Sequence, residues 1–257
     1  MAQTIRLCTW NIEFGFQLGA ILDALQDCDD FNAIDLLALQ EASARFGVKD
    51  ARAVAHTLGA QYEYYQVTAQ QIEGRAQANA LVWNTQRVQV LERGSVKLPH
   101  MHEVLLSRTE RALLRRLPPQ ERISIVVDGK LGAQTFRTYV AHLDVLGYRH
   151  KRQQFACILS DAQTRTACDL TIIAGDLNTF RLRSRPKWTT LEQDAKQAGF
   201  KDLTSDIRWT HSVARLRFRQ KLDAIFVKGA HPTHYRSWSL PIKGSDHIPV
   251  FAEIKAD

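Results

Sequence analysis

An alternation of short apolar runs with amphipathic helical patterns extends along the whole chain and constrains its fold more than any other feature. Residues 34–40 are apolar at almost every position, which is typical of a strand buried on both faces of a sheet. Residues 17–27 carry leucine and isoleucine at the i, i+3, i+4, i+7 spacing of an amphipathic helix. Because strands and helices alternate too regularly for an all-α or all-β protein, the pattern predicts an α/β fold with more than one sheet.

The same patterns predict the remaining elements. We expect further strands at residues 4–10, 78–83, 122–127, 135–141, 170–174, 222–227 and 249–254. We expect further helices at residues 51–58, 149–162 and 189–198. No linker rich in glycine, serine or proline divides the chain, so the sequence predicts one domain over residues 1–257.

The composition excludes several classes of protein. With 45% hydrophobic and 24% charged residues, the chain is neither disordered nor collagenous. Its 4 cysteines are far apart and form no paired motif, which favours reduced thiols and a reducing compartment. No leader pattern and no apolar run long enough to span a bilayer is visible, so we expect a soluble, cytoplasmic protein without a transmembrane segment. The formal net charge of +7 favours an anionic partner.

Polar side chains gather at the ends of the predicted strands, where a layered α/β fold collects its ligands. They are Asn11, Glu41, Asn79, His142, Asp176, Asn178, Asp223, Asp246 and His247. The carboxylates and amides in this set are hard oxygen ligands, which suit Mg²⁺ or Mn²⁺ better than zinc. The two histidines can act as acid, base or anion-stabilising groups near neutral pH. Hard-metal ligands together with histidines indicate phosphoryl chemistry.

The segments around these residues resemble the endonuclease/exonuclease/phosphatase superfamily, which includes DNase I and exonuclease III. In chain order they are residues 9–12 (TWNI), 39–41 (LQE), 79–81 (NAL), 141–143 (AHL), 175–178 (GDLN), 222–226 (LDAIF) and 245–250 (SDHIPV). Because they follow the order of the family and span nearly the whole chain, the sequence is identified as a member of this superfamily. One departure is Ala78, which stands where the family often has a glycine before the asparagine.

The resemblance implies a four-layer α/β/β/α sandwich, with two mixed β-sheets packed face to face, helices outside, and a metal-dependent phosphoesterase site at one edge. It implies that Glu41 is the principal ligand of Mg²⁺ or Mn²⁺, with Asn11 and Asp246 close to the metal. It also implies that Asp176 orients or deprotonates the attacking water, and that Asn178 holds this water or a phosphate oxygen. His247, oriented by Asp223, would contact the scissile phosphate or act as a base, and His142 would stabilise charge on the phosphoryl oxygens. A domain of this family can work as a monomer, which is our expectation here.

Substrate choice is predicted from basic and aromatic residues near these motifs. The candidate substrate-binding residues are Asn79, Arg181, Arg183, Trp188 and Arg219. Cationic side chains interleaved with aromatic rings favour a polyanionic backbone with bases that can stack, so DNA or RNA is the preferred substrate. A further basic group at residues 108–116 is interpreted as the solvated face of a helix.

Two alternatives stay open at this stage. The same basic rim could accept an anionic phospholipid or an inositol phosphate, as other members of the superfamily do. A catalytically dead binding module is disfavoured, because the metal ligands and the terminal histidine are all present.

Overall fold

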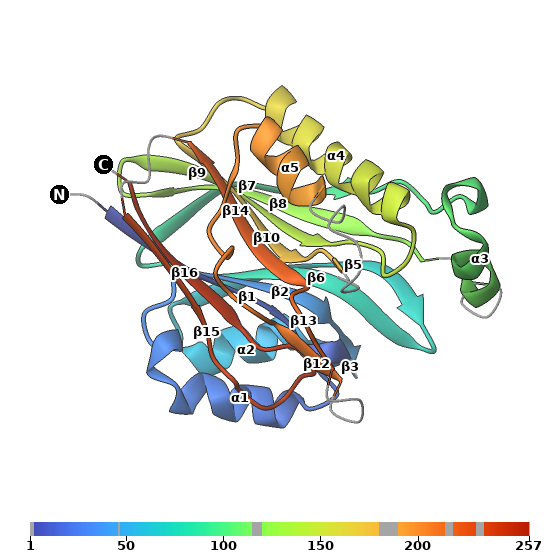
Figure 1. Cartoon of the computed structure of the whole chain (residues 1–257). Helices are drawn as coiled ribbons and strands as arrows, with labels where there is room; N and C mark the ends of the chain where they lie inside the picture. Colours follow the sequence, from blue (N-terminus) through green and yellow to red (C-terminus); the bar gives the residue numbers. More distant parts are fainter. Residues whose placement is uncertain are drawn as a thin grey trace.

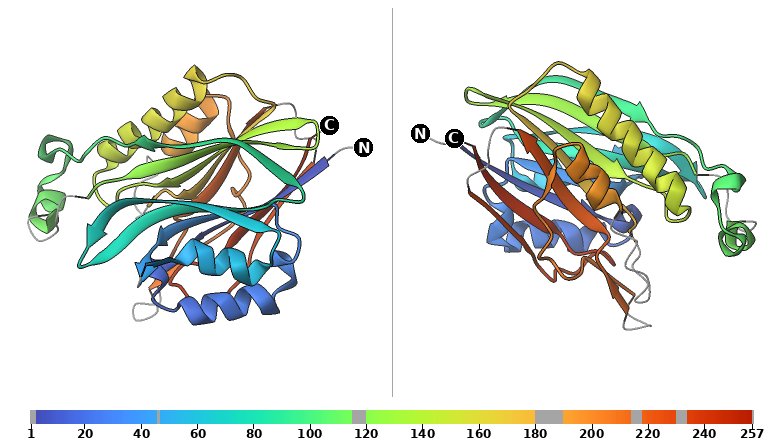
Figure 2. Two further views of the ribbon diagram at one scale, coloured as in Figure 1. Left: turned by 180° about the vertical axis from the view of Figure 1, so that it is seen from behind. Right: turned by 45° about the horizontal axis from the view of Figure 1, so that its top comes forward.

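Two six-stranded β-sheets pack face to face and carry helices on their outer surfaces (Figure 1). The computed structural model describes residues 3–45, 47–114, 120–179, 190–213, 218–229 and 234–256. The layers follow one another as helix, sheet, sheet and helix, which is the predicted α/β/β/α sandwich (Figures 1 and 2).

The first sheet has the strand order β15-β16-β1-β2-β6-β5. Its strands are β1 (Gln3–Asn11), β2 (Leu36–Ala42), β5 (Tyr62–Ile72), β6 (Arg75–Asn84), β15 (His234–Ser239) and β16 (Val250–Ala256). Helices α1 (Leu18–Asp27) and α2 (Asp50–Leu58) cover its outer face (Figure 1).

The second sheet has the strand order β11-β14-β10-β9-β8-β7. Its strands are β7 (Val88–Lys97), β8 (Ile123–Leu131), β9 (Gln134–His142), β10 (Leu170–Asp176), β11 (Lys201–Asp202) and β14 (Asp223–Gly229). Helices α4 (Tyr148–Thr164) and α5 (Thr190–Gln197) cover its outer face (Figure 2).

Shorter elements extend the connections between the sheets. They are the strand pairs β3 (Ala44–Arg45) with β4 (Val48–Lys49) and β12 (His211–Val213) with β13 (Phe218–Gln220), the helix α3 (Arg108–Leu114), and 3-10 turns at Glu13–Gly15, Asp29–Phe31 and Glu103–Leu105. Helix α3 projects from the sandwich and carries Arg108 and Arg111, both exposed, in agreement with the interpretation of a solvated helix face (Figure 1). Arg115 and Arg116 lie outside the described residues.

Three apolar clusters hold the layers together. One lies between the two sheets and includes Leu7, Ile125 and Ile172, which are all almost fully buried. A second joins the first sheet to α1 and α2 around Trp10, and a third joins the second sheet to α4 and α5 around Phe155. Because β2 and β10 face a core on both sides, their continuous apolar sequences are explained by burial.

The first and last strands of the chain are neighbours, since β1 pairs antiparallel with β16. The two chain ends therefore lie close together (Figure 1). This is the arrangement that one domain over the whole chain would give, and the division into domains stays a prediction.

Each strand and helix that the sequence predicted is present in the described residues, with ends shifted by a few positions. Of the strands in the two large sheets, β5, β7, β11 and β15 were not predicted. In β5 and β7 most residues are exposed or half-buried, so the apolar pattern that reveals the buried strands is weak there. No helix in the described ranges is both long and apolar enough to cross a membrane.

Candidate active site

Adjacent strands of the second sheet bring three of the predicted site residues into register. Asp176, at the end of β10, is paired with His142 at the end of β9 and with Asp223 at the start of β14. Gly175 precedes Asp176 with φ 152°, and a Cβ atom there would lie 1.9 Å from the carbonyl oxygen of Ala141. Only glycine allows the two strands to approach this closely beside the site.

Glu41 enters the site from the first sheet through an irregularity in β2. The pairing of β2 with β6 shifts register between Leu39 and Ala42, and Glu41 has a left-handed backbone with φ 54°. Such a bulge redirects a side chain that a regular strand would place elsewhere. Oε1 of Glu41 lies 3.6 Å from Nε2 of His142, and burial raises the pKa of this carboxyl to about 7.

Asp176 is buried and accepts hydrogen bonds at both carboxylate oxygens. Nδ2 of Asn11 donates to Oδ2 at 3.0 Å, and the backbone N–H of Asn178 donates to Oδ1 at 2.8 Å. Asn178 has φ 51°, a conformation that asparagine tolerates, and its Nδ2 donates to the carbonyl of Leu143 at 2.8 Å. Burial raises the pKa of Asp176. These contacts fix the carboxylate at the centre of the site.

His247 is held by Asp223. Nδ1 of His247 lies 2.7 Å from Oδ2 of Asp223, which leaves Nε2 facing Asp176 Oδ2 at 3.7 Å and Asp246 Oδ1 at 4.0 Å. Burial alone would lower the pKa of His247, but the charges of Asp223 and Asp176 outweigh it and raise this pKa to about 10. The charges of these carboxylates therefore favour the protonated imidazolium of His247.

His142 has the opposite environment. Burial lowers its pKa well below the ordinary value, and the positive charge of Arg122 adds to that effect. A guanidinium nitrogen of Arg122 lies 3.0 Å from Nδ1 of His142, while Nε of Arg122 pairs with Asp144 at 3.0 Å. Since arginine only donates, it favours the neutral imidazole. The sequence analysis did not find Arg122, because a lone arginine before a strand carries no motif.

His211 is a third histidine at the site, and the sequence analysis also missed it. Its Nε2 lies 3.3 Å from Oδ2 of Asp246, and its ring centroid is 4.7 Å from that of His247. Burial opposes ionisation of Asp246, but the hydrogen bond from His211 and the charge of His247 lower the pKa of Asp246. His211 lies in the short strand β12, whose sequence has no periodicity that could have marked it.

The predicted substrate-binding residues fall into three groups. Arg181, Arg183 and Trp188 lie outside the described residues. Arg219 is exposed on β13, with its guanidinium 4.3 Å from the ring centre of Trp209. Asn79 is buried, and its Nδ2 donates to the carbonyls of Ile123 at 2.9 Å and Val140 at 3.3 Å. The Asn79 amide nitrogen therefore links the two sheets, and its role toward a substrate stays a prediction.

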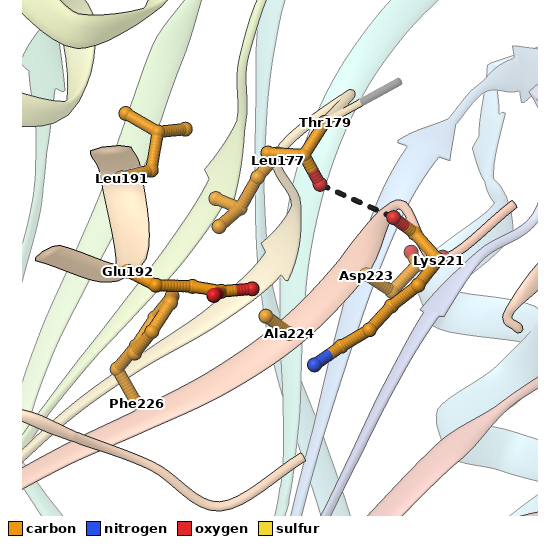
Figure 3. A pocket seen from close by; sticks show the side chains of 8 residues that line it. All are labelled: Leu177, Thr179, Leu191, Glu192, Lys221, Asp223, Ala224 and Phe226. Carbon is orange, nitrogen blue, oxygen red and sulfur yellow. Dashed lines mark hydrogen bonds between the residues drawn. The ribbon is translucent and has the colours of Figure 1, made fainter. Parts of the chain in front are cut away.

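A narrow pocket opens beside β14, on the side of α5 (Figure 3). Its lining residues are Leu177, Thr179, Leu191, Glu192, Lys221, Asp223, Ala224 and Phe226. The Thr179 hydroxyl donates to the carbonyl of Lys221 at 3.2 Å, which ties the loop after β10 to the start of β14. Oδ1 of Asp223, the oxygen that does not face His247, is buried and has no hydrogen-bond partner among the described residues.

The charges and ligand types at this site suit a divalent cation. Two groups of side chains have ligand atoms close enough to hold a metal: His211, Asp246 and His247, and Asp176, Asp223 and His247. Glu41 belongs to neither group, and its Oε1 lies 3.6 Å from Nε2 of His142 instead. The raised pKa of Glu41 has burial as its main cause, and the charge of Asp176 adds to it. A bound cation would relieve that unfavourable burial of negative charge.

The sequence matches the model of the endonuclease/exonuclease/phosphatase family over residues 8–247. The chain belongs to this family. Members of the family are hydrolytic phosphoesterases, and this protein is accordingly a phosphoric ester hydrolase. Among curated proteins, no similar sequence was found.

Solved structures with the same fold cover almost all of the chain. D. rerio TDP2 complexed with a single-strand DNA product has a TM-score of 0.71 at 13% identity, covering 98% of this chain and 99% of that one. An endonuclease/exonuclease/phosphatase from Beutenbergia cavernae has a TM-score of 0.70 at 14% identity, covering 99% and 72%. A family protein from Bacteroides thetaiotaomicron has a TM-score of 0.68 at 14% identity, covering 100% and 99%. At such identities the likeness establishes the fold.

Proposed function

We propose that this protein is a Mg²⁺- or Mn²⁺-dependent phosphodiesterase that hydrolyses DNA or RNA. The observation that carries the proposal is the cluster in which Asp176 Oδ2 lies within 4 Å of two histidines with opposite pKa shifts. One charged and one neutral imidazole beside a buried carboxylate can divide proton transfer and charge stabilisation between them.

In this proposal Glu41, Asn11 and Asp246 hold the cation, which when bound neutralises the phosphate and polarises its oxygens. Oδ1 of Asn11 already accepts a hydrogen bond from the backbone of Glu13 at 3.0 Å, so its orientation is fixed before any ligand arrives. The carboxylates of Glu41 and Asp246 then supply the negative charge that the cation requires.

The remaining side chains act on the water and the phosphate. Asp176 orients the attacking water and takes its proton, and Asn178 holds this water or a phosphate oxygen. His247, oriented by Asp223, donates a hydrogen bond or a proton from Nε2 to the phosphoryl group. His142 stays neutral and donates from one ring nitrogen to an oxygen that gains charge during the reaction. The roles of His247 and His142 each use the protonation state that the surroundings favour.

Two observations support nucleic acid as the substrate. The D. rerio TDP2 structure of the same fold contains a single-strand DNA product. In this chain, the guanidinium of Arg219 lies over the ring of Trp209, and Trp209 precedes His211 by two residues. A cation and an aromatic ring therefore stand together beside the site. Such pairs contact phosphates and stack on bases. The excess of 34 basic over 27 acidic residues acts in the same direction.

The decisive experiment is nicking of supercoiled plasmid with Mg²⁺ or Mn²⁺, compared with EDTA and with an Asp176→Asn variant shown to be folded. We expect nicking that needs the metal and is lost in the variant. A folded Asp194→Asn variant, changed in an exposed ion pair with Arg152, serves as the matched control.

The absence of both plasmid nicking and hydrolysis of short single strands of DNA and RNA by folded wild-type protein with bound metal would contradict the nuclease proposal. An anionic phospholipid and an inositol phosphate would then be assayed in that order. Activity on either of these two would assign the site to the lipid or inositol branch of the family.

A further inference from the structure

We propose that Lys151 is a positioning residue for hydrolysis, because its ammonium ties the loops after β9 and β10 together and so holds Asn178 in place. Lys151 lies in the first turn of α4, on the side that packs against the second sheet, and is 5% exposed. The role in hydrolysis rests on the proposed function, in which Asn178 holds the attacking water or a phosphate oxygen. The tie between the loops is a property of the fold and does not depend on that function.

The ammonium of Lys151 bridges two backbone carbonyls that come from different loops. Its Nζ donates to the carbonyl oxygen of Val145 at 2.8 Å and to that of Asn178 at 2.7 Å. Val145 lies three residues after His142, where β9 ends. Asn178 lies two residues after Asp176, where β10 ends. One buried side chain therefore joins the two segments that carry the neutral histidine and the buried carboxylate of the site.

Asn178 depends on this contact because its backbone has an unusual conformation. Its φ is 51°, in the left-handed region, which asparagine tolerates but does not prefer. The N–H of Asn178 donates to Oδ1 of Asp176 at 2.8 Å, and its Nδ2 donates to the carbonyl of Leu143 at 2.8 Å. Its own carbonyl accepts from Lys151. Loss of that last contact removes a charged donor from a buried residue, so the peptide group can rotate and displace the amide side chain.

The buried charge of Lys151 is compensated in part by carboxylates around it. Burial lowers the pKa of Lys151 to about 8, against the negative charges of Asp176, Glu110 and Asp144, which favour the ammonium. These carboxylates come from β10, α3 and the loop after β9, and Asp144 also pairs with Arg122. At neutral pH the side chain is therefore a charged donor, and charged donors form stronger hydrogen bonds to carbonyls than neutral donors do.

Kinetics separate positioning from a purely structural role. Lys151→Met should lower kcat by about 10- to 100-fold with KM changed by less than about threefold, because a displaced Asn178 weakens an interaction made in the transition state. The matched control is Tyr139→Phe, which removes a hydrogen bond of 2.6 Å from Tyr139 on β9 to Asp161 near the other end of α4. This control should lose stability and keep kcat. Equal kcat in folded Lys151→Met and Tyr139→Phe would overturn the proposal.

The pH dependence of kcat gives a readout that a structural role would not move. Wild-type kcat should fall above about pH 8, where Lys151 loses its proton. Lys151→Arg keeps a charged donor that does not titrate in this range, so it should restore most of the activity at about pH 7 and move the fall to higher pH. The same fall in both proteins would contradict the proposal. If neither variant folds, the titration of Lys151 in the wild type, followed by NMR of lysine labelled at the ε carbon, must coincide with the fall in kcat, and disagreement would refute it.

Amide hydrogen exchange tests the tie between the loops without turnover. The N–H of Asn178 donates to Oδ1 of Asp176, and the N–H of Leu143 donates to the carbonyl of Asp176 at 3.0 Å. Both should exchange at least about tenfold faster in Lys151→Met than in Tyr139→Phe. Equal exchange in the two variants would overturn the proposal. Faster exchange in Lys151→Met, with a wild type that hydrolyses no nucleic acid, would support the tie between the loops and remove the proposed function.

Discussion

Oδ2 of Asp176 lies almost equally far from two histidines, 3.8 Å from Nε2 of His142 and 3.7 Å from Nε2 of His247. The neighbours behind the two rings have opposite charge. Arg122 stands beside His142, whose pKa is lowered, and Asp223 stands beside His247, whose pKa is raised. Environments that move two pKa values apart allow two chemically identical side chains to take different roles.

The first prediction concerns His247. We expect His247→Ala to lower kcat by at least about 100-fold while the protein still folds, because a positioned acid or base contributes about 10²- to 10⁴-fold. The measurement is steady-state hydrolysis with Mg²⁺, with folding checked by circular dichroism. His56→Ala is the control, and a near-normal rate in His247→Ala would remove this residue from the mechanism.

The second prediction concerns the buried pair behind His142. Burial alone would raise the pKa of Asp144, but hydrogen bonds from His150 and Arg122 outweigh it and lower this pKa. A carboxyl whose pKa is lower in the folded protein than in the unfolded chain contributes its full stabilisation when the pH is above the unfolded-state pKa. This contribution is lost as the pH falls through the folded-state pKa. Asp144→Asn should therefore cost about 3 to 5 kcal/mol at neutral pH, and less in acid.

Urea unfolding of wild type and Asp144→Asn at neutral pH and at about pH 3, below the ordinary pKa of an aspartate, measures this difference. Asp194→Asn, which breaks the exposed pair with Arg152, should change the free energy of unfolding by less than about 1 kcal/mol. If the loss in free energy of unfolding caused by Asp144→Asn instead grew as the pH was lowered, it would contradict the lowered pKa assigned to Asp144.

Burial explains which strands could be predicted from the sequence. The strands β2 and β10 are apolar throughout because they have a core on each face. The strand β5 alternates between buried, half-buried and exposed positions and contains several polar residues, so only its pairing with β6 in the folded chain reveals it. Periodicity thus predicts central strands better than edge strands.

The site was predictable where it lies in short motifs at strand ends, as at Asp176 and His247. Arg122 and His211 could not be predicted in this way, because each reaches the site through contacts between segments far apart in the sequence. Arg122 is 20 residues from His142, and His211 is bridged to His247 through β12. The left-handed backbone of Glu41 was equally invisible, since it follows from a shift in strand pairing.

The third prediction separates two roles for Asn79. If its main role is to link the sheets, Asn79→Ala should lower the free energy of unfolding by about 1 to 3 kcal/mol, because the carbonyls of Ile123 and Val140 lose a donor. KM and kcat of the folded fraction should stay close to those of the wild type. Chemical denaturation and steady-state kinetics test both points. Asn32→Ala, at an exposed turn, is the control, and a raised KM with normal stability would instead favour substrate binding.

The last prediction concerns the stability that the protein loses by burying the carboxylate of Glu41. Burial raises the pKa of this carboxyl from 4.5 to about 7, so the folded protein favours its neutral form. Such a carboxyl does not destabilise the fold when the pH is below its pKa in the unfolded chain. Above its pKa in the folded protein, it lowers the free energy of unfolding by the full amount, about 3 kcal/mol. With EDTA at about pH 8, Glu41→Gln should be more stable than the wild type by up to this amount, and the difference should vanish near pH 4.

Mg²⁺ should stabilise the wild type more than the variant, because the cation compensates a charge that glutamine lacks. Urea unfolding with EDTA and with Mg²⁺ measures both effects, with Glu63→Gln, an exposed position on β5, as the control. A Glu41→Gln protein that is less stable than the wild type at every pH would show that the carboxylate already has compensating partners without the metal.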